Sequence, residues 1–593
     1  MSTKYKEFSN DRVISKQFFS LLPAQILLVF IPSLNGIISG LFGSNMLGEK
    51  ALTAIGIFAP AISLIGAATG VMMGGAQILT GRYMGKNQVE RTQQIFSLDL
   101  AAVGALSLVI SAVFAIAALF GLTGFLNSDP EVIRMFNGYI LGVSIGIVPM
   151  MLSNQLSVFL SMEMEGNRSS QAMGVFVVIN FFLTWLFLKV FRFQTFGLAL
   201  AGAIGYWVSF LYQIAFYFFG KSILKVKLPT SIGPDLAEMI AIGFPGALTS
   251  LYMTVRRLVL NSLITTYAGN AGMSAFAASD TLLSVFWTIP LGMSTVGRML
   301  MSVAQGEEDR QTLKYIFRIL MTRCVLIEIV IAAFIMVMSV PFTSLYYHDP
   351  SAPVYDMTVM AFRIIPLAMP LGLIAMTWTG YAQVMGKEVL IHTLSLLDGA
   401  LCICLWAMAL VPVIGMNGVY IAVVINAVVT ALYPVLFSLV VNRGKIRTTD
   451  ELLMIPDSFG VTEEERLDLS LRSYPEAVNI SRTIQSFCLD RGIDHRRSFL
   501  SALCLEEMAI TIIDIGFAKD PSAHSVDVRV VHRDDSIIMR IKDDCSAMNP
   551  EELAKIVDSD DITKNIGVRT VYKIAEEISY QNILGLNVLT IKM

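Results

Sequence analysis

Six ionisable side chains stand in long apolar stretches of the second half of the chain: Arg256, Arg257, Asp280, Glu328, Arg363 and Asp398. An ionised group at the centre of a bilayer costs about 3 kcal/mol on insertion scales, so such groups usually pair, line a pathway or bind an ion. A carboxylate can take up a proton or coordinate a cation, and a guanidinium group matches the planar shape of carboxylates and phosphates. These residue types therefore indicate ion coupling or contact with a charged solute.

Two of these charges also have a structural explanation. A turn near Gly269 would fold the flanking segments into a helical hairpin, in which Arg257 and Asp280 differ in depth by about 5 Å at a rise of about 1.5 Å per residue. An ion pair between them would fix the packing of the two helices and lower the free-energy cost of inserting both charges into the membrane. Glu328 and Asp398 then remain as the less compensated acids and the stronger candidates for ion coupling.

Arg256 needs a different partner, because it lies about 100° around the helix from its neighbour Arg257. Glu328, Asp398 and an anionic substrate are the alternatives. Adjacent arginines within one apolar segment hint at an anionic ligand.

The first half of the chain carries amides where the second half carries charges. Asp99 lies nearer the end of its segment, and the polar positions in the middle of apolar segments are Asn35, Gln77, Asn154, Gln155 and Asn180. An amide cannot release a proton, so this half is not expected to be the site of proton coupling.

The composition is that of a membrane protein. Of the 593 residues, 55% are hydrophobic and only 15% are charged, whereas soluble proteins carry about 25% charged residues. Turn signals divide the chain up to residue 440 into about twelve apolar segments, each near the length of about 20 residues that spans a bilayer. The expected spans are 16–41, 51–80, 91–121, 133–160, 168–190, 197–219, 236–266, 271–300, 312–341, 353–384, 389–411 and 416–440.

The connections between these segments alternate between a basic set and a set of short connections with Gly, Asn, Asp and Pro. By the positive-inside rule this places both termini in the cytoplasm. The expected location is the inner cell membrane. The N-terminal residues show no cleavage site after a short apolar core, so a cleaved signal peptide is not expected.

An internal repeat divides the membrane part into two halves. Leu34-Asn35 followed by Ile38 and Gly43 returns as Leu260-Asn261 followed by Ile264 and Gly269. We expect two parallel lobes of about six helices each, residues 13–220 and 235–441, with a pathway between them. The predicted fold is thus an all-α polytopic membrane protein with a separate cytoplasmic domain.

The membrane part resembles the multidrug and toxic compound extrusion (MATE) family. The resemblance rests on the GRYMGK and MEMEGN sequences and on a Gly-rich loop after the first helix, with Gly43, Gly48, Ala54 and Gly56. It implies a V-shaped pair of lobes and export of organic solutes in antiport with H⁺ or Na⁺. Several members carry a carboxylate on the first and fifth helices, where this chain has Asn35 and Asn180.

The chain beyond residue 441 has the composition of a soluble protein. We expect a linker over 442–464 and a domain over 465–593, long enough for a core of its own. The predicted elements are a strand near Leu467–Leu471, helices from Pro475 and Arg497, two paired strands, a helix from Ile566 and a final strand. Helices on one face of a mixed sheet would make an α+β sandwich.

This domain resembles the ATP-binding fold of anti-sigma-factor kinases and histidine kinases. The similar segments are Glu507-x-x-x-Thr511, IKDDCSAMNPEE and KNIGVRTVYKIAEEISYQ. The resemblance implies ATP with Mg²⁺ as a ligand, Glu507 as the base, Asp543 at the adenine, and Asn565 to Gly567 at the phosphates.

The kinase resemblance is degraded at its catalytic positions. Thr511 replaces the Mg²⁺-binding Asn, with Asp514 a partial substitute, and Cys545 and Ala547 replace glycines. We therefore expect a regulatory or partner-binding domain without kinase activity.

The predicted function is a secondary active exporter of small organic solutes, not an enzyme. The six cysteines and five histidines show no metal-binding spacing, no P-loop is present, and no nucleic-acid partner is expected. One alternative is a flippase for an anionic lipid-linked or peptidic substrate, suggested by Arg256 and Arg257. Another is a membrane sensor whose cytoplasmic domain sequesters a regulatory protein.

Overall fold

The computed structural model describes residues 11–593 apart from 48, 128, 221, 462–464, 472, 520–523, 525, 534–535, 546–548 and 556–564. The side chains at 11–12, 32–41, 43–45, 49, 52, 59, 517–519 and 533 also lie outside the described part. Among the described residues, eleven helices are long and apolar enough to cross a membrane.

The first group of helices precedes residue 220. Its members are α1 (Asp11–Leu47), α2 (Glu49–Gly85), α3 (Val89–Leu119), α4 (Pro130–Met162), α5 (Gly166–Trp185) with the π-helical segment η1 (Leu186–Val190), and α6 (Gln194–Phe219). The second group contains α7 (Ile232–Gly306), α8 (Arg310–Ile319), η2 (Leu320–Cys324), α9 (Val325–Val337), α10 (Ser339–Ser344), α11 (Pro353–Ile364), η3 (Ile365–Leu367), α12 (Ala368–Met385), α13 (Glu388–Leu396), η4 (Leu397–Leu401), α14 (Cys402–Ile414) and α15 (Met416–Val441).

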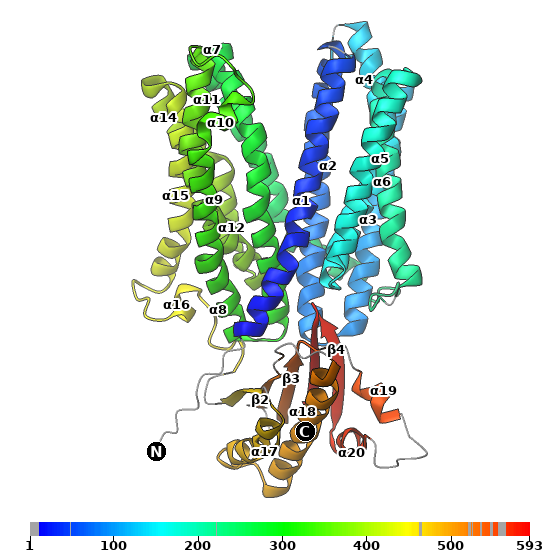
Figure 1. The fold of residues 1–593 in the computed structure, drawn as a ribbon, viewed down its shortest axis with the longest axis vertical. Helices are drawn as coiled ribbons and strands as arrows, with labels where there is room; N and C mark the ends of the chain where they lie inside the picture. Colours follow the sequence, from blue (N-terminus) through cyan, green and yellow to red (C-terminus); the bar gives the residue numbers. More distant parts are fainter. Residues whose placement is uncertain are drawn as a thin grey trace.

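The structure has eleven candidate membrane-spanning helices in its described part, whereas about twelve spans were expected, because helix α7 covers two of the expected spans. At a rise of about 1.5 Å per residue a straight helix of its 75 residues would be about 112 Å long, far beyond the bilayer core of about 30 Å. Gly269, with φ 60° and ψ −156°, interrupts it with a conformation that glycine adopts readily. The two parts of α7 therefore form a hairpin, whose turn lies at the end of the molecule far from the C-terminal domain (Figure 1).

The helices form two groups that are separate at that far end and meet near the C-terminal domain (Figure 1). Helices α2 and α7 approach backbone to backbone where the groups meet. A Cβ on Gly75 would lie 1.9 Å from the carbonyl oxygen of Met239, and one on Gly243 would lie 1.8 Å from that of Val71. Only glycine permits this approach, so the contact closes the side of the helical body that faces the C-terminal domain.

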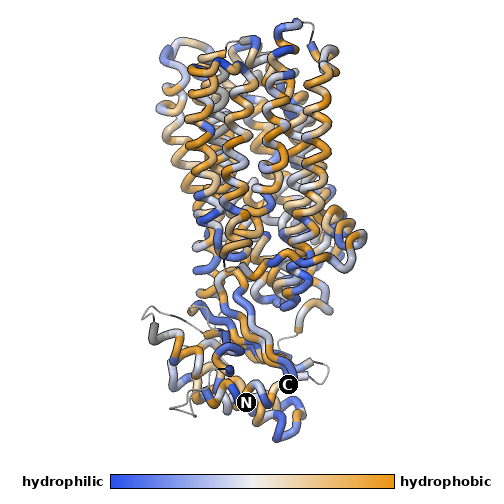
Figure 2. Tube along the Cα trace, turned by 90° about the vertical axis from the view of Figure 1, so that its right-hand side faces the viewer, coloured by the Kyte–Doolittle hydropathy of each residue, from blue (hydrophilic) through white to orange (hydrophobic). Residues whose placement is uncertain are grey.

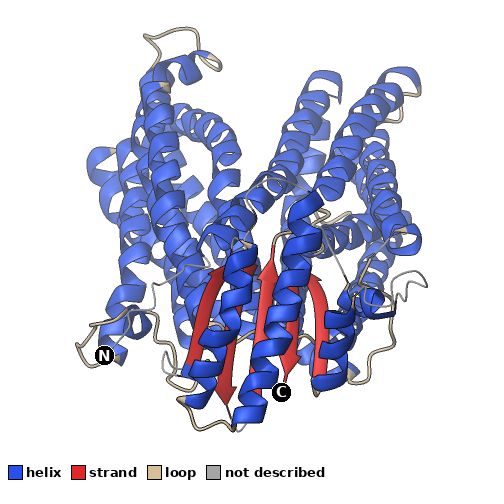
Figure 3. Ribbon diagram, turned by 60° about the horizontal axis from the view of Figure 1, so that its bottom comes forward, coloured by secondary structure: helices blue, strands red, loops and turns tan. Residues whose placement is uncertain are grey.

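The C-terminal domain contains a five-stranded sheet in the order β1-β2-β3-β5-β4. The strands are β1 (Arg466–Leu471), β2 (Val526–Arg533), β3 (Ser536–Asp543), β4 (Glu577–Ile583) and β5 (Leu586–Lys592). Helices α17 (Tyr474–Leu489) and α18 (His495–Lys519) cover one face, beside α20 (Ile566–Ile574) (Figure 3). Two short helices, α16 (Thr449–Leu452) and α19 (Pro550–Lys555), complete the chain.

Two expectations for this domain were wrong. Each neighbouring pair of strands is antiparallel, so the sheet is not mixed. The segment expected to continue the last helix forms β4 instead, in which Ile578 pairs with Ile591 of β5. The residues of this segment alternate between polar and apolar, and the next strand along the chain, β5, is available to pair with it. This pairing outweighs the local helix propensity.

Among the described residues the hydrophobic interior forms three core clusters, two centred in the helical body and one in the C-terminal domain. Most residues along the helical body are apolar, whereas polar and apolar residues are mixed in the C-terminal domain (Figure 2). The domain has a core of its own around Leu505, Val528 and Ile591. The end of its β4–β5 hairpin does not belong to that core, because Ile583 and Leu584 pack into a core of the helical body.

Candidate functional site

Two predicted acids lie beside π-helical segments within the second group of helices. Glu328 is in the first turn of α9, directly after η2, and its side chain is fully buried. Asp398 lies within η4 and accepts a hydrogen bond of 2.9 Å from Nδ2 of Asn426 on α15. Single π-helical turns inside α-helices are rare and often mark functional sites.

Glu328 is the less satisfied of the two acids. Neither of its carboxylate oxygens has a hydrogen-bond partner among the described residues. Burying an ionised carboxylate without a partner is very unfavourable, so such a group is retained as the neutral acid or with a bound cation. The local arrangement thus provides a place for a proton or a small cation.

Asp99 of α3 shares this property and was underestimated from the sequence. Its side chain is fully buried, and both of its oxygens lack a hydrogen-bond partner in the part of the chain that is described. Distance from the end of an apolar segment was a poor guide here, because packing against neighbouring helices determines burial.

The predicted ion pair between Arg257 and Asp280 is not formed. Both side chains are exposed, and within the described residues neither has an ion pair shorter than 4 Å. Arg256 interacts electrostatically with Asp398 most strongly and then with Asp280. The depth calculation set the height of each residue along the hairpin, but the rotation of each helix decides which side chains meet.

Of the two predicted amides in the first group of helices, the structure describes the side chain of Asn180 only. Asn180 is buried on α5, where its Oδ1 accepts a hydrogen bond of 3.4 Å from Thr184. Asn35 belongs to α1, but its side chain lies outside the described residues.

Arg298 is a polar contact between the helix groups that the sequence analysis missed. Its Nε donates to Gln77 of α2 at 2.9 Å and its Nη1 to Gln383 of α12 at 3.4 Å. It lies in an apolar stretch of α7, so the criterion that selected Arg256 would have selected it too. This residue adds a polar bridge to the backbone contact between α2 and α7.

The kinase-like residues of the C-terminal domain come together only in part. A Cβ on Gly567 would lie 2.0 Å from Oε2 of Glu507, so this carboxylate sits against the start of α20. Burial, and secondarily the charge of Glu506, raises the pKa of Glu507 above its ordinary value. A carboxylate in this position opposes the binding of phosphate groups at the same helix start.

The other predicted nucleotide contacts are engaged elsewhere. Asp543 accepts hydrogen bonds from Nδ2 of Asn587 at 2.7 Å and from the backbone N–H of Cys545 at 3.0 Å. The Thr511 hydroxyl donates to the carbonyl of Glu507 in its own helix, and Nδ2 of Asn565 donates to the carbonyl of Leu553. Asp514 is exposed on α18.

A cluster of His524, Asp544 and Cys545 has ligand types that suit a metal ion, with their ligand atoms within 4.8 Å of one another. The Asp544 carboxylate is already paired: its Oδ2 lies 2.6 Å from Nζ of Lys16 and its Oδ1 lies 3.1 Å from Nδ1 of His524. An ammonium group in contact with the carboxylate opposes a second cation. The cluster therefore serves as a polar contact between the C-terminal domain and α1.

The strongest contacts between the C-terminal domain and the helical body are two buried ion pairs at the α7–α8 turn. Asp309 lies 2.6 Å from Nη1 of Arg529, and Glu307 lies 2.5 Å from Nζ of Lys542. Burial would raise the pKa of Asp309, but the charges of Arg529 and Lys542 outweigh burial and hold that pKa well below its ordinary value of 3.8. Burial would likewise lower the pKa of Arg529, but Asp309 and Asp468 raise it.

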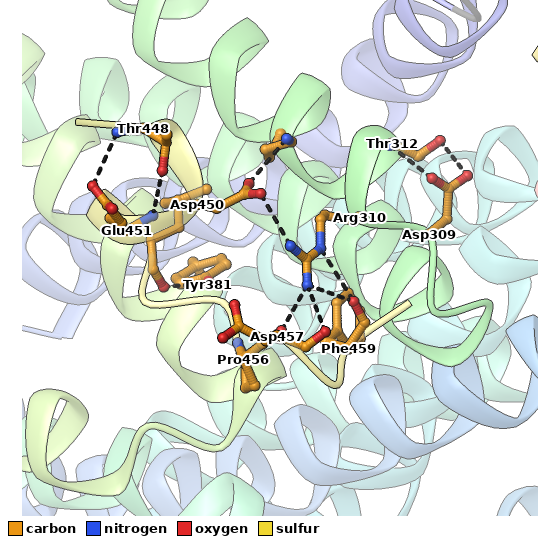
Figure 4. A network of polar contacts seen from close by, with 12 residues as sticks. Asp309, Arg310, Thr312, Tyr381, Thr448, Asp450, Glu451, Pro456, Asp457 and Phe459 are labelled. Carbon is orange, nitrogen blue, oxygen red and sulfur yellow. Dashed lines mark hydrogen bonds and ion pairs between the residues drawn. The ribbon is translucent and has the colours of Figure 1, made fainter. Parts of the chain in front are cut away.

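The segment that joins the two parts is also held against the helical body. Arg310 donates to the carbonyls of Pro456 at 2.7 Å and Phe459 at 2.8 Å, and it pairs with Asp450 at 3.1 Å (Figure 4). The Tyr381 hydroxyl donates to the carbonyl of Leu453 at 2.6 Å. The predicted linker is thus a packed strap over most of its length.

Together, the apolar helices, their two groups and the buried unpaired acids define a polytopic membrane transporter. The family model described as MatE matches residues 24–186 and 245–398, which is more than half of the chain. The chain therefore belongs to the MatE family, whose members are transporters and not enzymes.

Similar proteins agree with this assignment. Multidrug export protein MepA from Staphylococcus saprophyticus is 24% identical over 230 residues, which are 38% of this chain and 50% of that protein. The chain thus spans about half the length of this curated relative in the match.

Solved structures share the fold of the membrane part. A crystal structure of MATE in complex with MaL6 has a TM-score of 0.67 at 22% identity, covering 71% of this chain and 94% of that one. An outward-facing multidrug resistance MATE transporter gives 0.65 at 22% identity, with the same shares. A MOP superfamily transporter from Pyrococcus furiosus gives 0.63 at 21%, covering 71% and 95%.

Proposed function

We propose that this protein is a secondary active exporter of organic solutes, driven by antiport of H⁺ or Na⁺. Membership of the MatE family and the similarity to a multidrug export protein support export of drugs or related compounds. The C-terminal domain and both termini would lie in the cytoplasm of a cell whose inner membrane holds the helices, as the distribution of basic residues predicts.

The burial of Glu328 without a hydrogen-bond partner is the observation that carries the coupling proposal. An acid in this state exchanges a proton readily when its surroundings change between two conformations, and it favours H⁺ over Na⁺, which needs several oxygen ligands. Asp398, held by Asn426, is the second coupling candidate. Asp280 and Asn180 are assigned to the solute pathway rather than to coupling.

A transport assay in proteoliposomes with pH and Na⁺ gradients imposed separately tests this proposal. We expect a pH gradient alone to drive solute flux, and Glu328→Gln to reduce that flux about tenfold or more because the amide cannot carry a proton. Glu388→Gln is the matched control, since Glu388 is exposed at the start of α13. Undiminished pH-driven flux in Glu328→Gln would remove this residue from the coupling mechanism.

The C-terminal domain is proposed to be regulatory, with at most weak binding of ATP and Mg²⁺. Asp543 and Thr511 support this view because both already make hydrogen bonds within the domain, and the Glu507 carboxylate lies against the helix start where phosphates would bind. Calorimetry with the full chain in detergent is the test. Binding of MgATP at micromolar concentration would contradict the assignment and would indicate a competent nucleotide site.

A flippase for an anionic lipid-linked or peptidic substrate is the second candidate function. Arg257 is exposed on α7 without an ion pair shorter than 4 Å among the described residues, which leaves it available to an anionic group. The discriminating measurement is flux of an anionic lipid analogue: loss of that flux in Arg257→Gln, with drug flux unchanged, would favour the flippase.

A further inference from the structure

The β4–β5 hairpin of the C-terminal domain has an end that belongs structurally to the helical body. Ile583, Leu584 and Leu586 are 4%, 1% and 6% exposed, and they lie in the same hydrophobic core as residues of α1, α7 and α8. The hairpin reaches the ends of the membrane helices in Figure 1, where it is drawn in red. Residues 583–586 are called the clamp hairpin below.

The turn of the clamp hairpin has a residue that its conformation does not favour. Ile583 pairs with Leu586, and the two residues between them both have positive φ, 52° for Leu584 and 79° for Gly585. Such two-residue turns strongly prefer Asn or Asp before Gly, and a bulky residue at positive φ is an outlier. The Leu584 side chain is buried among the membrane helices, and this burial offsets the cost of the unfavourable backbone conformation.

The clamp hairpin contacts both groups of helices. In the first group, Nε2 of Gln17 on α1 donates to the carbonyl of Leu584 at 2.6 Å, and a Cβ on Gly585 would lie 2.9 Å from Met164. In the second group, Val303 of α7 and Ile316 of α8 line the same cleft as Leu584.

The two ion pairs at the α7–α8 turn hold β3, which pairs with β5 of the hairpin, and β2, which pairs with β3 on its other side. Lys542 of β3 and Arg529 of β2 bind Glu307 and Asp309. The C-terminal domain is therefore fixed to the second group by charge while its hairpin also contacts the first group.

The helix groups are closed where the clamp hairpin sits. A Cβ on Gly306 of α7 would lie 2.1 Å from the carbonyl oxygen of Arg82 on α2, and Arg82 donates to Gln305 at 2.9 Å. Opening this side would separate α2 from α7 and draw α1 and Met164 away from the α7–α8 turn. The hairpin spans that boundary, so it resists the separation.

We propose that the clamp hairpin is an autoinhibitory lock, which keeps the helix groups closed on the side of the C-terminal domain until the hairpin is released. The inference rests on the proposed export function, because transport by alternating access requires that side to open in each cycle. Release of the domain would then set the rate of export.

Spin-label distances between the two groups test the lock without a transport assay. Glu90→Cys in the first turn of α3 and Lys445→Cys after α15 place labels on exposed positions of the two groups, and the six native cysteines are buried. We expect one short distance in the parent protein and an added longer distance with Leu584→Asp. Ile566→Asp is the matched control, because Ile566 is an exposed residue of the same domain.

A crosslink tests the same lock in the opposite direction. A Cβ at residue 585 would lie 3.1 Å from the Cγ of Met164, which is where a cysteine Sγ would be, and this suits an S–S bond of about 2.05 Å. We expect Met164→Cys with Gly585→Cys to lose solute flux when oxidised and to regain it on reduction. Each single cysteine variant controls for strain in the turn.

The results separate the two proposals. An unchanged distance distribution in Leu584→Asp, or full flux in the oxidised double-cysteine variant, would overturn the lock. A longer distance in Leu584→Asp, in a protein that shows no gradient-driven flux with any solute, would support the lock and reject the export function. If Leu584→Asp does not fold, the crosslink alone decides.

Discussion

Asp309 and Arg529 meet across the boundary between the helical body and the C-terminal domain, 2.6 Å apart, with side chains 1% and 16% exposed. The same carboxylate also caps α8, since it accepts a hydrogen bond of 3.0 Å from the backbone N–H of Thr312. One acidic side chain thus begins a membrane-spanning segment and binds a soluble domain, so the position of the domain is tied to the geometry of the α7–α8 turn.

Asp309→Asn should weaken docking while it keeps the helix cap. An asparagine caps a helix as well as an aspartate, but the neutral amide leaves Arg529 buried with less compensation, at a cost of about 3–5 kcal/mol. Hydrogen exchange of β2 in the full chain should rise accordingly. Asp356→Asn, at an exposed position of α11, should change nothing.

Docking through Asp309 should be insensitive to pH in the physiological range. Its pKa in the docked state is depressed, so the contribution is fully present above the ordinary pKa of about 3.9 and is lost only as the pH falls through the lower, docked-state value. The protection of the β2 backbone amides from hydrogen exchange, corrected for intrinsic rates, should be the same at pH 5 and at pH 8. Weakening of the ion pair between pH 8 and pH 5 would contradict the prediction.

Asp527 should have the opposite pH dependence. Burial raises the pKa of this β2 carboxyl from 3.8 to about 6, despite a hydrogen bond from Ser470. The folded state favours the protonated form, so the contribution is present below pH 4 and is lost as the pH rises through 6. Asp527→Asn should therefore stabilise the domain at pH 7.5 by up to about 3 kcal/mol and have little effect at pH 4. Equal stabilisation at both pH values would exclude titration of Asp527 as the cause.

Gly243→Ala should open the contact between α2 and α7. The added methyl would lie 1.8 Å from the carbonyl oxygen of Val71, which is backbone and cannot rotate away. Overpacking of this kind costs about 1–3 kcal/mol, and the spin-label pair at residues 90 and 445 should report a longer distance. Gly246→Ala, where nothing lies within 4 Å, is the control in the same helix.

The positions of the apolar helices along the chain were largely predictable because apolar length is a local signal. The Gly269 turn was predicted as well, and it separates the two parts of the α7 hairpin. The direction of the sheet was not predictable, because β1 pairs with β2 and β3 pairs with β5 across long stretches of sequence. The strand β4 was missed because the Glu577–Ile583 segment also suits a helix.

Candidate residues could be selected from the sequence where a long apolar run surrounds a charge. They were missed where the burial of the residue depends on how distant helices or domains pack. Glu328 and Asp398 were selected because long apolar runs surround them. Asp99 and Arg298 needed the positions of neighbouring helices, and the pairing of Asp309 with Arg529 needed the position of another domain. No periodic pattern in the chain encodes such a contact.

The packed strap between the two parts has a kinetic consequence. Because Arg310 holds the carbonyls of Pro456 and Phe459, little free chain remains before β1 begins at Arg466. A domain on so short a tether stays near its docking surface at an effective concentration of roughly millimolar. Rebinding would therefore be fast, and a soluble competitor would need either comparable abundance or much higher affinity to keep the domain detached.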